Sequence, residues 1–368
     1  MLLEGVPAKV VQEMLGHAKI SQTIDTYYYV LLTGQADVAR KLDSPLFYTS
    51  PPKPVKMLHK KGVLVRLVSG WRQVSRFGAW FGYKTPAKEG TVAMTTDGRL
   101  TICQISDIHC GSAYFVPDLL ERSILEINDY DPTAVVVSGD LTDAGYRQEY
   151  EQAAEYVRRL HCENLMVIPG NHDSRNVGYI HFERLFGERY SVIEFDEAIM
   201  VGVDSSEPDL NDGRVGREHY GFIRSCLENA GDKLKIFVVH HHLIPIPGTG
   251  RERNIIFDAG DVLELLADVN VDLVLSGHKH VPYSWRVENM FIVNAGTAST
   301  TRLRGNTRPC YNVIEIEHGR VRVFRKYPFK ERELTVDFDA QTREYSRFEE
   351  RIDSEIHSPQ YGSSLNDR

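Results

Sequence analysis

The most regular pattern in this chain is a set of short apolar, β-branched runs that each stop abruptly at polar residues. The runs are RLTICQIS, TAVVVS, NLMVIP, KIFVVH and VDLVLS. Uninterrupted Val, Ile and Leu runs of this length are typical of strands that are buried on both faces. Apolar residues at helical spacing recur near 117–130, 146–160, 217–229 and 259–269. Strands that alternate with helices predict an α/β fold.

The second half of the chain adds strands with fewer helices between them. Further strand patterns cover 199–204, 290–294, 311–317 and 320–326, and the segment 317–320 predicts a hairpin turn. After Lys330 the sequence is polar and mixed in charge, so we expect a polar, partly disordered tail over 331–368. The expected α/β domain therefore covers 98–330.

Each of the five apolar runs ends at a motif rich in Asp, His or Asn. In order, the motifs are Asp107-Ile108-His109, Gly139-Asp140, Gly170-Asn171-His172-Asp173, His240-His241-His242 and Gly277-His278-Lys279-His280. Open α/β sheets bind ligands outside the carboxyl ends of their strands, so these loops are expected to form one site. A single Asp after a strand is more often a helix cap, and a single His an ordinary core or surface residue. Five such motifs in order favour a metal site.

The types of donor atom indicate the chemistry of this site. Carboxylate, imidazole and carbonyl donors suit Mn, Fe and Zn. Two such ions, roughly 3.5–4 Å apart, can clamp the attacking and leaving oxygens of a displacement at phosphorus. The sequence has no Cys-x-x-Cys pair, which argues against a structural zinc ribbon. The residues therefore predict two divalent metal ions acting on a phosphoester.

The histidine triplet leaves one ligand assignment open. Consecutive residues of a strand point to opposite faces, so the three histidines cannot all bind metal. Continuing the preceding strand favours His240, with His241 as the alternative ligand or as a substrate contact. His242 is expected to line the pocket wall.

In this order and spacing, the five motifs resemble those of the calcineurin-like metallophosphoesterases, most of all the class III cyclic-nucleotide phosphodiesterase group. The resemblance covers about residues 98–328. It implies a sandwich of two mixed β-sheets flanked by helices. Of the metal ligands that it implies, Asp107, His109 and His280 hold the first ion, Asn171, His240 and His278 the second, and Asp140 both.

The same resemblance implies a mechanism for hydrolysis. A hydroxide shared by the two ions would attack the phosphorus. His172 would assist the leaving oxygen, and Asp143 could orient His172, since an acidic imidazole needs its other nitrogen fixed. The alternative for Asp143 is that it caps a helix beginning near Ala144.

The substrate expected from the motifs is a small phosphodiester, either a cyclic nucleotide or another small diester. Protein Ser/Thr phosphatases of this superfamily carry two arginines at places that hold Ala144 and Pro169 here, which argues against a phosphoprotein. A loop over 245–257 could bring Arg251 or Arg253 to the substrate phosphate. The alternatives are a lipid-linked phosphoester at a membrane surface, a nuclease, or a non-catalytic metal-binding or interaction protein.

Composition sets the remaining bounds. The hydrophobic share of 42% supports a sizeable core, and the net charge of −8 argues against a nucleic-acid coat protein. Five cysteines, an odd and sparse set, do not resemble a secreted disulfide framework. The first residues lack the features of a secretory signal, so a cytoplasmic location is expected, with peripheral membrane contact as an option. The oligomeric state is left open.

Residues 1–43 lie outside the five motifs and show a separate pattern. The stretch EGVPAKVVQEMLGHAKISQTIDTYYYV resembles the C-terminal end of phage-integrase-type tyrosine recombinases, with His17 as the catalytic histidine and Tyr27 as the nucleophile. The upstream arginines of that family do not precede it, and Tyr29 stands where a histidine usually follows. We therefore expect no recombinase activity. A fusion remnant, a mis-set start codon and a reused helical element remain as origins.

Residues 44–97 form a second extension, a basic and aromatic linker. Its part over 44–88 contains no Asp or Glu, and a proline-rich start at 51–54 marks a linker. Apolar residues at three- and four-residue steps over 60–83 predict a basic amphipathic helix with aromatic anchors. That helix could pack on the catalytic domain or a partner chain, lie at a membrane surface, or contact nucleic acid.

Overall fold

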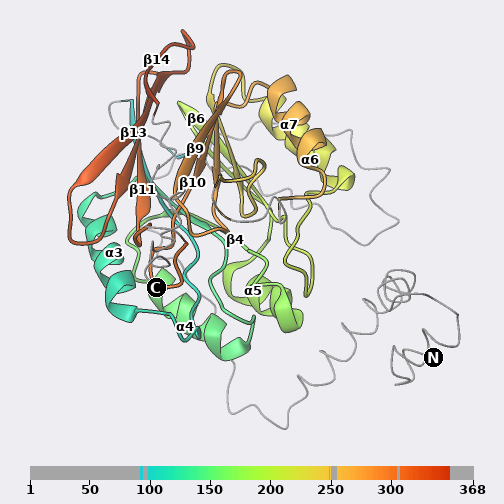
Figure 1. Cartoon of the computed structure of the whole chain (residues 1–368). Helices are drawn as coiled ribbons and strands as arrows, with labels where there is room; N and C mark the ends of the chain where they lie inside the picture. The colour runs from blue at the N-terminus through green and yellow to red at the C-terminus, as the bar shows by residue number, and fades with distance from the viewer. Residues whose placement is uncertain (1–91, 94–97, 248, 250–254, 305–306, 349–368) are drawn as a thin grey trace, which may run out of the picture. The chain divides into compact units, whose positions relative to one another are not determined.

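The computed structural model describes residues 92–93, 98–247, 249, 255–304 and 307–348. Within these ranges the chain forms two seven-stranded β-sheets, and their apolar inner faces share one core (Figure 1). Both sheets mix parallel and antiparallel strands. This is the α/β sandwich of two mixed sheets that the sequence predicts. The recombinase-like fragment over 1–43 and the amphipathic helix over 60–83 lie outside the described residues and stay predictions.

The first sheet contains strands from the middle of the chain. Its spatial order is β1 (Val92–Ala93), β5 (Ser191–Phe195), β6 (Ala198–Val203), β7 (Leu234–Val239), β8 (Leu273–Ser276), β10 (Met290–Asn294) and β9 (Tyr283–Val287). The central strands β6, β7, β8 and β10 run parallel, whereas β5 and β9 pair antiparallel with their neighbours β6 and β10. The carboxyl ends of the parallel strands therefore meet at one edge.

The second sheet joins three strands from 99–168 to the last four described strands. Its order is β14 (Tyr345–Phe348), β13 (Arg332–Asp339), β12 (Arg320–Lys326), β11 (Tyr311–Glu317), β2 (Arg99–Ile105), β3 (Ala134–Ser138) and β4 (Asn164–Ile168). β2, β3 and β4 are parallel, because helical crossovers connect them, and the other pairs are antiparallel. The expected hairpin turn is confirmed, since Glu317 and Arg320 face each other across β11 and β12.

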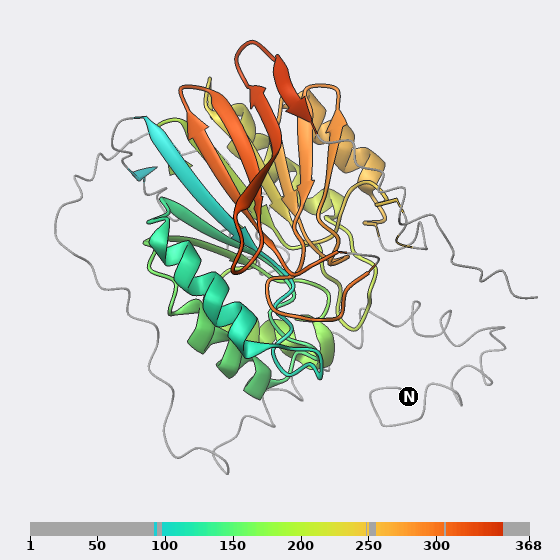
Figure 2. The ribbon, with the colours of Figure 1, turned by 60° about the vertical axis from the view of Figure 1, so that its left-hand side comes forward.

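Helices cover the outer faces of the sandwich. α3 (Pro117–Asp129), α4 (Arg147–Val157) and α5 (Gly178–Phe186) pack on the second sheet, and a short 3-10 turn over Arg175–Val177 precedes α5. α6 (Arg217–Glu228) and α7 (Ala259–Asp268) pack on the first. Figure 2 shows the green helices against the sheet that contains the cyan β2, on the side away from the other sheet. The strand residues are apolar on both sides because each sheet lies between a helical layer and the other sheet.

The sheet continues beyond the boundary expected at residue 330. β13 pairs with β12, and its residues Val336 and Phe338 are buried in the core between the sheets. Residues 332–348 therefore belong to the sandwich and not to a polar tail. The pattern misled because β13 alternates polar and apolar positions, and its polar side is covered by partners such as Arg320, which donates to the buried Asp337.

None of the helices in the described ranges combines the length and the apolar content needed to cross a membrane.

Candidate metal centre

The five predicted motifs follow the carboxyl ends of β2, β3, β4, β7 and β8. Three of these strands belong to one sheet and two to the other, so the site spans the ends of both sheets. Backbone hydrogen bonds join the loops directly: Asp107 N donates to Gly139 O (3.0 Å), and Gly277 N donates to His240 O (2.9 Å). All seven predicted metal ligands are thereby brought to one edge of the sandwich.

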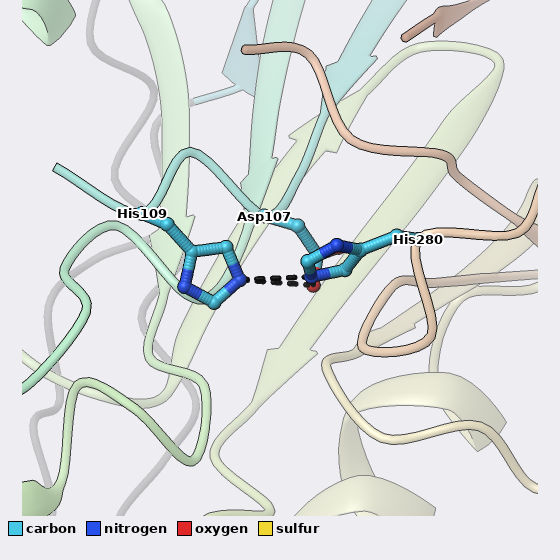
Figure 3. Close-up of side chains that lie close together, drawn as sticks. All are labelled: Asp107, His109 and His280. Carbon is cyan, nitrogen blue, oxygen red and sulfur yellow. Dashed lines mark hydrogen bonds and ion pairs between the residues drawn. The ribbon is translucent and has the colours of Figure 1, made fainter. Parts of the chain in front are cut away.

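Acidic and imidazole side chains converge there in three overlapping groups. Within the described residues these groups are Asp107–His109–His280, His109–Asp140–His172 and Asp140–His240–His278, each with ligand atoms within 4.8 Å of one another. In the first group, Asp107 and His109 from the loop after β2 and His280 from the loop after β8 point toward one another (Figure 3). His109 and Asp140 each belong to two of the groups.

The distances between carboxylate oxygens and imidazole nitrogens in the centre are longer than those of good hydrogen bonds. His240 Nε2 lies 3.4 Å from Asp140 Oδ2, and His109 Nε2 lies 3.6 Å from the same oxygen. His280 Nε2 is 3.3 Å from Asp107 Oδ1 and 2.9 Å from His109 Nε2. Lone-pair atoms of several residues therefore face a common space, which is the arrangement that a cation requires.

Buried nitrogen atoms without a partner test whether metal ions fit. His240 Nε2 and His278 Nε2 are buried and make no hydrogen bond within the described part of the chain. His109 Nδ1 also has no partner there, but it lies toward Asp143 Oδ1 (3.7 Å), whereas His109 Nε2 faces the other ligands. Such atoms are rare in folded proteins because losing water without replacement is costly. His240 Nδ1 bonds Ser138 O at 2.8 Å, which turns Nε2 toward Asp140. An imidazole fixed at one nitrogen and free at the other is typical of a metal ligand, so the residues fit divalent ions.

The backbone at this site is unusual. Five of the seven predicted ligands have positive φ angles: Asp107, His109, Asp140, His278 and His280. Residues with side chains adopt this left-handed conformation infrequently, and each instance stores strain of order 1 kcal/mol or more. Strain of this kind persists where the surrounding fold holds it in place, and it concentrates at functional sites.

Two glycines allow the loops to approach one another closely. A Cβ atom at Gly170 would lie 2.2 Å from Asp140 Oδ1, and one at Gly277 would lie 2.0 Å from Ser106 Oγ and 2.7 Å from Asp107 Oδ2. Any side chain there would displace a predicted carboxylate ligand. The Gly-Asn-His-Asp and Gly-His-Lys-His motifs therefore need glycine for steric reasons.

The electrostatic environment keeps both carboxylates ionised. Burial alone would raise the pKa of Asp140, but His240 and His172 outweigh burial and hold that pKa well below its usual range. The pKa of Asp107 is lowered for the same reason, with burial opposed by His280. Burial lowers the pKa of His109 to about 3, so its ring is neutral. Burial would lower the pKa of His240 too, but Asp140 raises it to about 9.

Hydrogen bonds distinguish the three consecutive histidines. Both ring nitrogens of His241 have protein partners: Nδ1 lies 2.8 Å from Ser205 Oγ, and Nε2 lies 3.3 Å from Asn211 O. His240 keeps Nε2 free, as described above. His242 is buried and stacks on His278 with ring centroids 5.6 Å apart. The geometry therefore favours His240 over His241 as a ligand and leaves His241 no ring nitrogen to offer a substrate.

Asn171 is held by two neighbours. Its Oδ1 lies 2.8 Å from His278 Nδ1, and its Nδ2 donates to Asn211 Oδ1 at 3.4 Å. The second bond fixes the orientation of the amide and turns its oxygen toward the centre. Asn211 comes from the loop after β6, which the sequence motifs do not indicate.

His172 is oriented by a backbone atom and not by the Asp143 side chain. His172 Nδ1 lies 2.5 Å from Asp143 O but 3.8 Å from Asp143 Oδ1. Arg175 Nη1 donates to the same carbonyl at 3.1 Å and lies 2.9 Å from His172 Nδ1. The Arg175 guanidinium can only donate hydrogen bonds. The Asp143 carbonyl therefore accepts one bond from Arg175 Nη1 and a second, short one from His172 Nδ1–H. Asp143 does not cap the helix either, because α4 begins at Arg147 and Glu149 accepts the Ala144 and Tyr146 amides.

Asp173 ties two of the loops together. Its carboxylate accepts hydrogen bonds from the amides of Gly170, Leu141 and Thr142 and from Thr142 Oγ1. Burial and the nearby Asp140 raise its pKa to about 7, with these hydrogen bonds opposing the rise. Its role in the structure is to hold the Asp140 loop against the Asn171 loop.

Sequence reasoning missed two further supports of the site. The loop after β10 is fastened to the first motif: Thr297 Oγ1 donates to Asp107 O, and Ser299 Oγ donates to Ile108 O, both at 2.8 Å. Beneath the centre, the buried Gln104 donates to Ser138 Oγ (3.0 Å) and to Ser276 O (3.1 Å), linking strands of both sheets. A glutamine inside an otherwise apolar strand was the signal available for the latter.

Two predicted substrate contacts cannot be placed. Arg251 and Arg253 lie outside the described residues, so their contact with a substrate phosphate stays a prediction.

Comparison with known proteins agrees with this geometry. Residues 100–282 match the family model described as calcineurin-like phosphoesterase, and the match includes every predicted metal ligand. The chain carries a calcineurin-like phosphoesterase domain. The domain is that of a metal-dependent phosphoric ester hydrolase, and its His and Asp groups are candidates for holding divalent ions.

Among its relatives is a probable cyclic nucleotide phosphodiesterase of Coxiella burnetii. It is 24% identical over 256 residues, covering 66% of this chain and 96% of that protein. A glycerophosphodiester phosphodiesterase of Enterobacter lignolyticus is 27% identical over 194 residues, or 50% of this chain and 69% of that protein. In three dimensions the phosphoesterase domain resembles a purple acid phosphatase from yellow lupin seeds, with a TM-score of 0.51 and 15% identity over 72% of this chain and 56% of that one. The structural likeness concerns the fold.

Proposed function

We propose that this phosphoesterase hydrolyses a small phosphodiester, a cyclic nucleotide or another small diester, with two divalent ions held by the seven predicted ligands. The observation that carries the proposal is the position of Asp140 between two ligand groups, beside imidazole nitrogens that have no other partner. A shared carboxylate is the feature that separates a two-metal site from a single ion site. The relatives support a diester, because both named above are phosphodiesterases.

The side chains divide the work of the proposed reaction. Divalent ions bound there would act as Lewis acids on a phosphoester. Asp107, His109 and His280 would hold one ion, Asn171, His240 and His278 the other, and Asp140 both. His172 is placed to hand a proton or a hydrogen bond to the leaving oxygen through Nε2, because its Nδ1 is occupied by the Asp143 carbonyl.

The deciding experiment is hydrolysis of bis-p-nitrophenyl phosphate by the full chain with and without added Mn²⁺. Changing Asp140→Asn should lower kcat/KM by roughly a thousandfold or more, since it removes the shared ligand. The matched control is Asp232→Asn, which changes an exposed carboxylate and should leave the rate unaltered. Elemental analysis of both variants shows whether Asp140→Asn also lowers the bound metal.

The proposal fails if metal-loaded protein hydrolyses no diester, or if Asp140→Asn matches the parent in both rate and metal content. A panel of cyclic nucleotides, glycerophosphodiesters, phospholipids and nucleic acid then ranks the substrate classes. The lipid-linked alternative depends on the segment 60–83, which lies outside the described residues.

A further inference from the structure

A loop that none of the five motifs includes passes directly beside the candidate centre. After β10 the chain runs through buried residues up to Thr300 and then surfaces at Arg302 and Arg304. The Arg302 carbonyl lies 2.7 Å from His280 Nδ1, and the Arg302 amide donates to Thr300 Oγ1 at 3.0 Å. The backbone at Arg302 is therefore fixed against a predicted metal ligand, while its side chain is exposed.

The second arginine of the loop reaches back across the site. Arg304 Nη1 donates to Thr249 O at 3.4 Å, in the segment predicted to lie over the centre. Arg304 is also close enough to Asp107 and to His242 to interact with both electrostatically. Arg304 therefore contacts Thr249 and lies within electrostatic range of the predicted ligand Asp107.

A third cation adjoins the pair. Lys279 is buried between the predicted ligands His278 and His280, and its electrostatic neighbours include Arg304 and Asp212. Three cationic residues, Arg302, Arg304 and Lys279, therefore gather beside the predicted ligands.

We propose that Arg302 and Arg304 form a subsite for a second anionic group of the substrate, a carboxylate or phosphate carried beyond the scissile phosphodiester. This inference rests on the proposed phosphodiesterase function and specifies its substrate class. The scissile phosphate would bind at the ligand cluster, so the exposed side chains of Arg302 and Arg304 would contact what the ester carries, and Arg304 would give up its long bond to Thr249 O (3.4 Å) for that contact. Guanidinium groups suit this role because their planar N–H donors match carboxylate and phosphate oxygens.

Three synthetic diesters with one leaving group test the subsite. p-Nitrophenyl propyl phosphate is the reference, and its 2-carboxyethyl and 2-phosphonoethyl analogues add only an anionic end. The parent should prefer either analogue over the propyl ester by roughly tenfold or more in kcat/KM, the usual value of a charge-assisted contact. The preference should shrink in about 1 M salt, where screening extends over about 3 Å.

The variant pair Arg302→Gln with Arg304→Gln should reduce the ratio of kcat/KM between analogue and propyl ester to about one. The control pair is Arg217→Gln with Arg224→Gln on α6, whose side chains pair with Asp261 and Asp268 of α7; it removes the same charge and should leave that ratio as in the parent. Equal rates for the three esters in the parent, or an unchanged ratio in the Arg302 and Arg304 variant, overturn the subsite. Failure of all three esters to react would instead overturn the proposed function.

Discussion

Two buried polar clusters in this molecule have opposite hydrogen-bonding states. The first surrounds Glu126 on α3, whose Oε1 accepts from Arg122 Nε (2.7 Å) and Phe329 N (3.0 Å). Its Oε2 accepts from Lys326 Nζ (2.7 Å) and Tyr311 OH (3.2 Å). The second is the candidate metal centre, where buried imidazole nitrogens have no partner within the described residues.

The difference teaches how to separate a stabilising cluster from a functional one. Around Glu126 every carboxylate oxygen has two donors, so the cluster ties α3 to β11 and β12 and has no capacity left for a ligand. At the strand ends the fold keeps lone pairs unsatisfied and the backbone strained. Buried polar atoms without a hydrogen bond persist where a ligand completes their bonding, and divalent ions fit the unpartnered imidazole nitrogens here.

Metal addition should produce the largest contrast between the clusters. At a metal concentration about a thousand times Kd, binding should raise the free energy of unfolding by about 4 kcal/mol. His240→Ala should lose most of that gain, whereas Glu126→Gln should keep it. Chemical denaturation of metal-free and metal-loaded protein measures both. An equal gain in the two variants would show that His240 does not hold a metal.

Breaking the Glu126 cluster should lower the free energy of unfolding and leave the rate of hydrolysis unchanged. Glu126→Gln leaves the buried Lys326 without its anionic partner and should lower the free energy of unfolding by about 3 kcal/mol. The matched control is Glu121→Gln on the same helix, a half-exposed residue paired with Arg159, which should cost less than about 1 kcal/mol. If Glu126→Gln abolishes hydrolysis while remaining stably folded, the division between the clusters is wrong.

The contribution of Glu126 should also depend on pH. Burial would raise the pKa of this carboxyl, but hydrogen bonds from Lys326 and Phe329 outweigh burial and lower the pKa below its ordinary value of 4.5. Because folding lowers the pKa of Glu126, its ionised carboxylate contributes its full stability above pH 4.5. This contribution disappears as the pH falls below that value. The gap between parent and Glu126→Gln should therefore be constant near neutrality and close in acid. Urea titrations at several pH values measure this difference in the free energy of unfolding. A difference that persists in acid would contradict the lowered pKa of Glu126.

The smallest effect is expected at Asp143. Its carboxylate oxygen is 3.8 Å from His172 Nδ1, too far for a hydrogen bond, while its carbonyl makes the contact. Asp143→Asn keeps the carbonyl and should lower kcat by at most about fivefold, the equivalent of about 1 kcal/mol. Steady-state kinetics on one diester decide this. A hundredfold loss of kcat would instead show that the Asp143 carboxylate orients His172, as the sequence predicts.

Much of the site could be predicted from sequence because its chemistry is local to strand ends. Each buried strand reads as an apolar run, and the polar residue after it must lie at the carboxyl edge of the sheet. That reasoning brought Asp107, Asp140, Asn171 and the histidines of the fourth and fifth motifs to one place, as the structure has them. The prediction of a polar tail beyond Lys330 is wrong, because the polar residues of β13 alternate with apolar ones and find partners in the sheet.

The sequence by itself determined which residue types end each strand, and so the α/β sandwich and the donor set of its edge. Only the tertiary structure decided which atoms face the centre. His240 differs from His241 because Ser138, Ser205 and Asn211 occupy different ring nitrogens, and Asp143 contributes a carbonyl in place of its carboxylate. Periodicity reports which side of an element is buried, whereas these contacts join residues far apart in the chain, and their geometry is set when the two sheets pack.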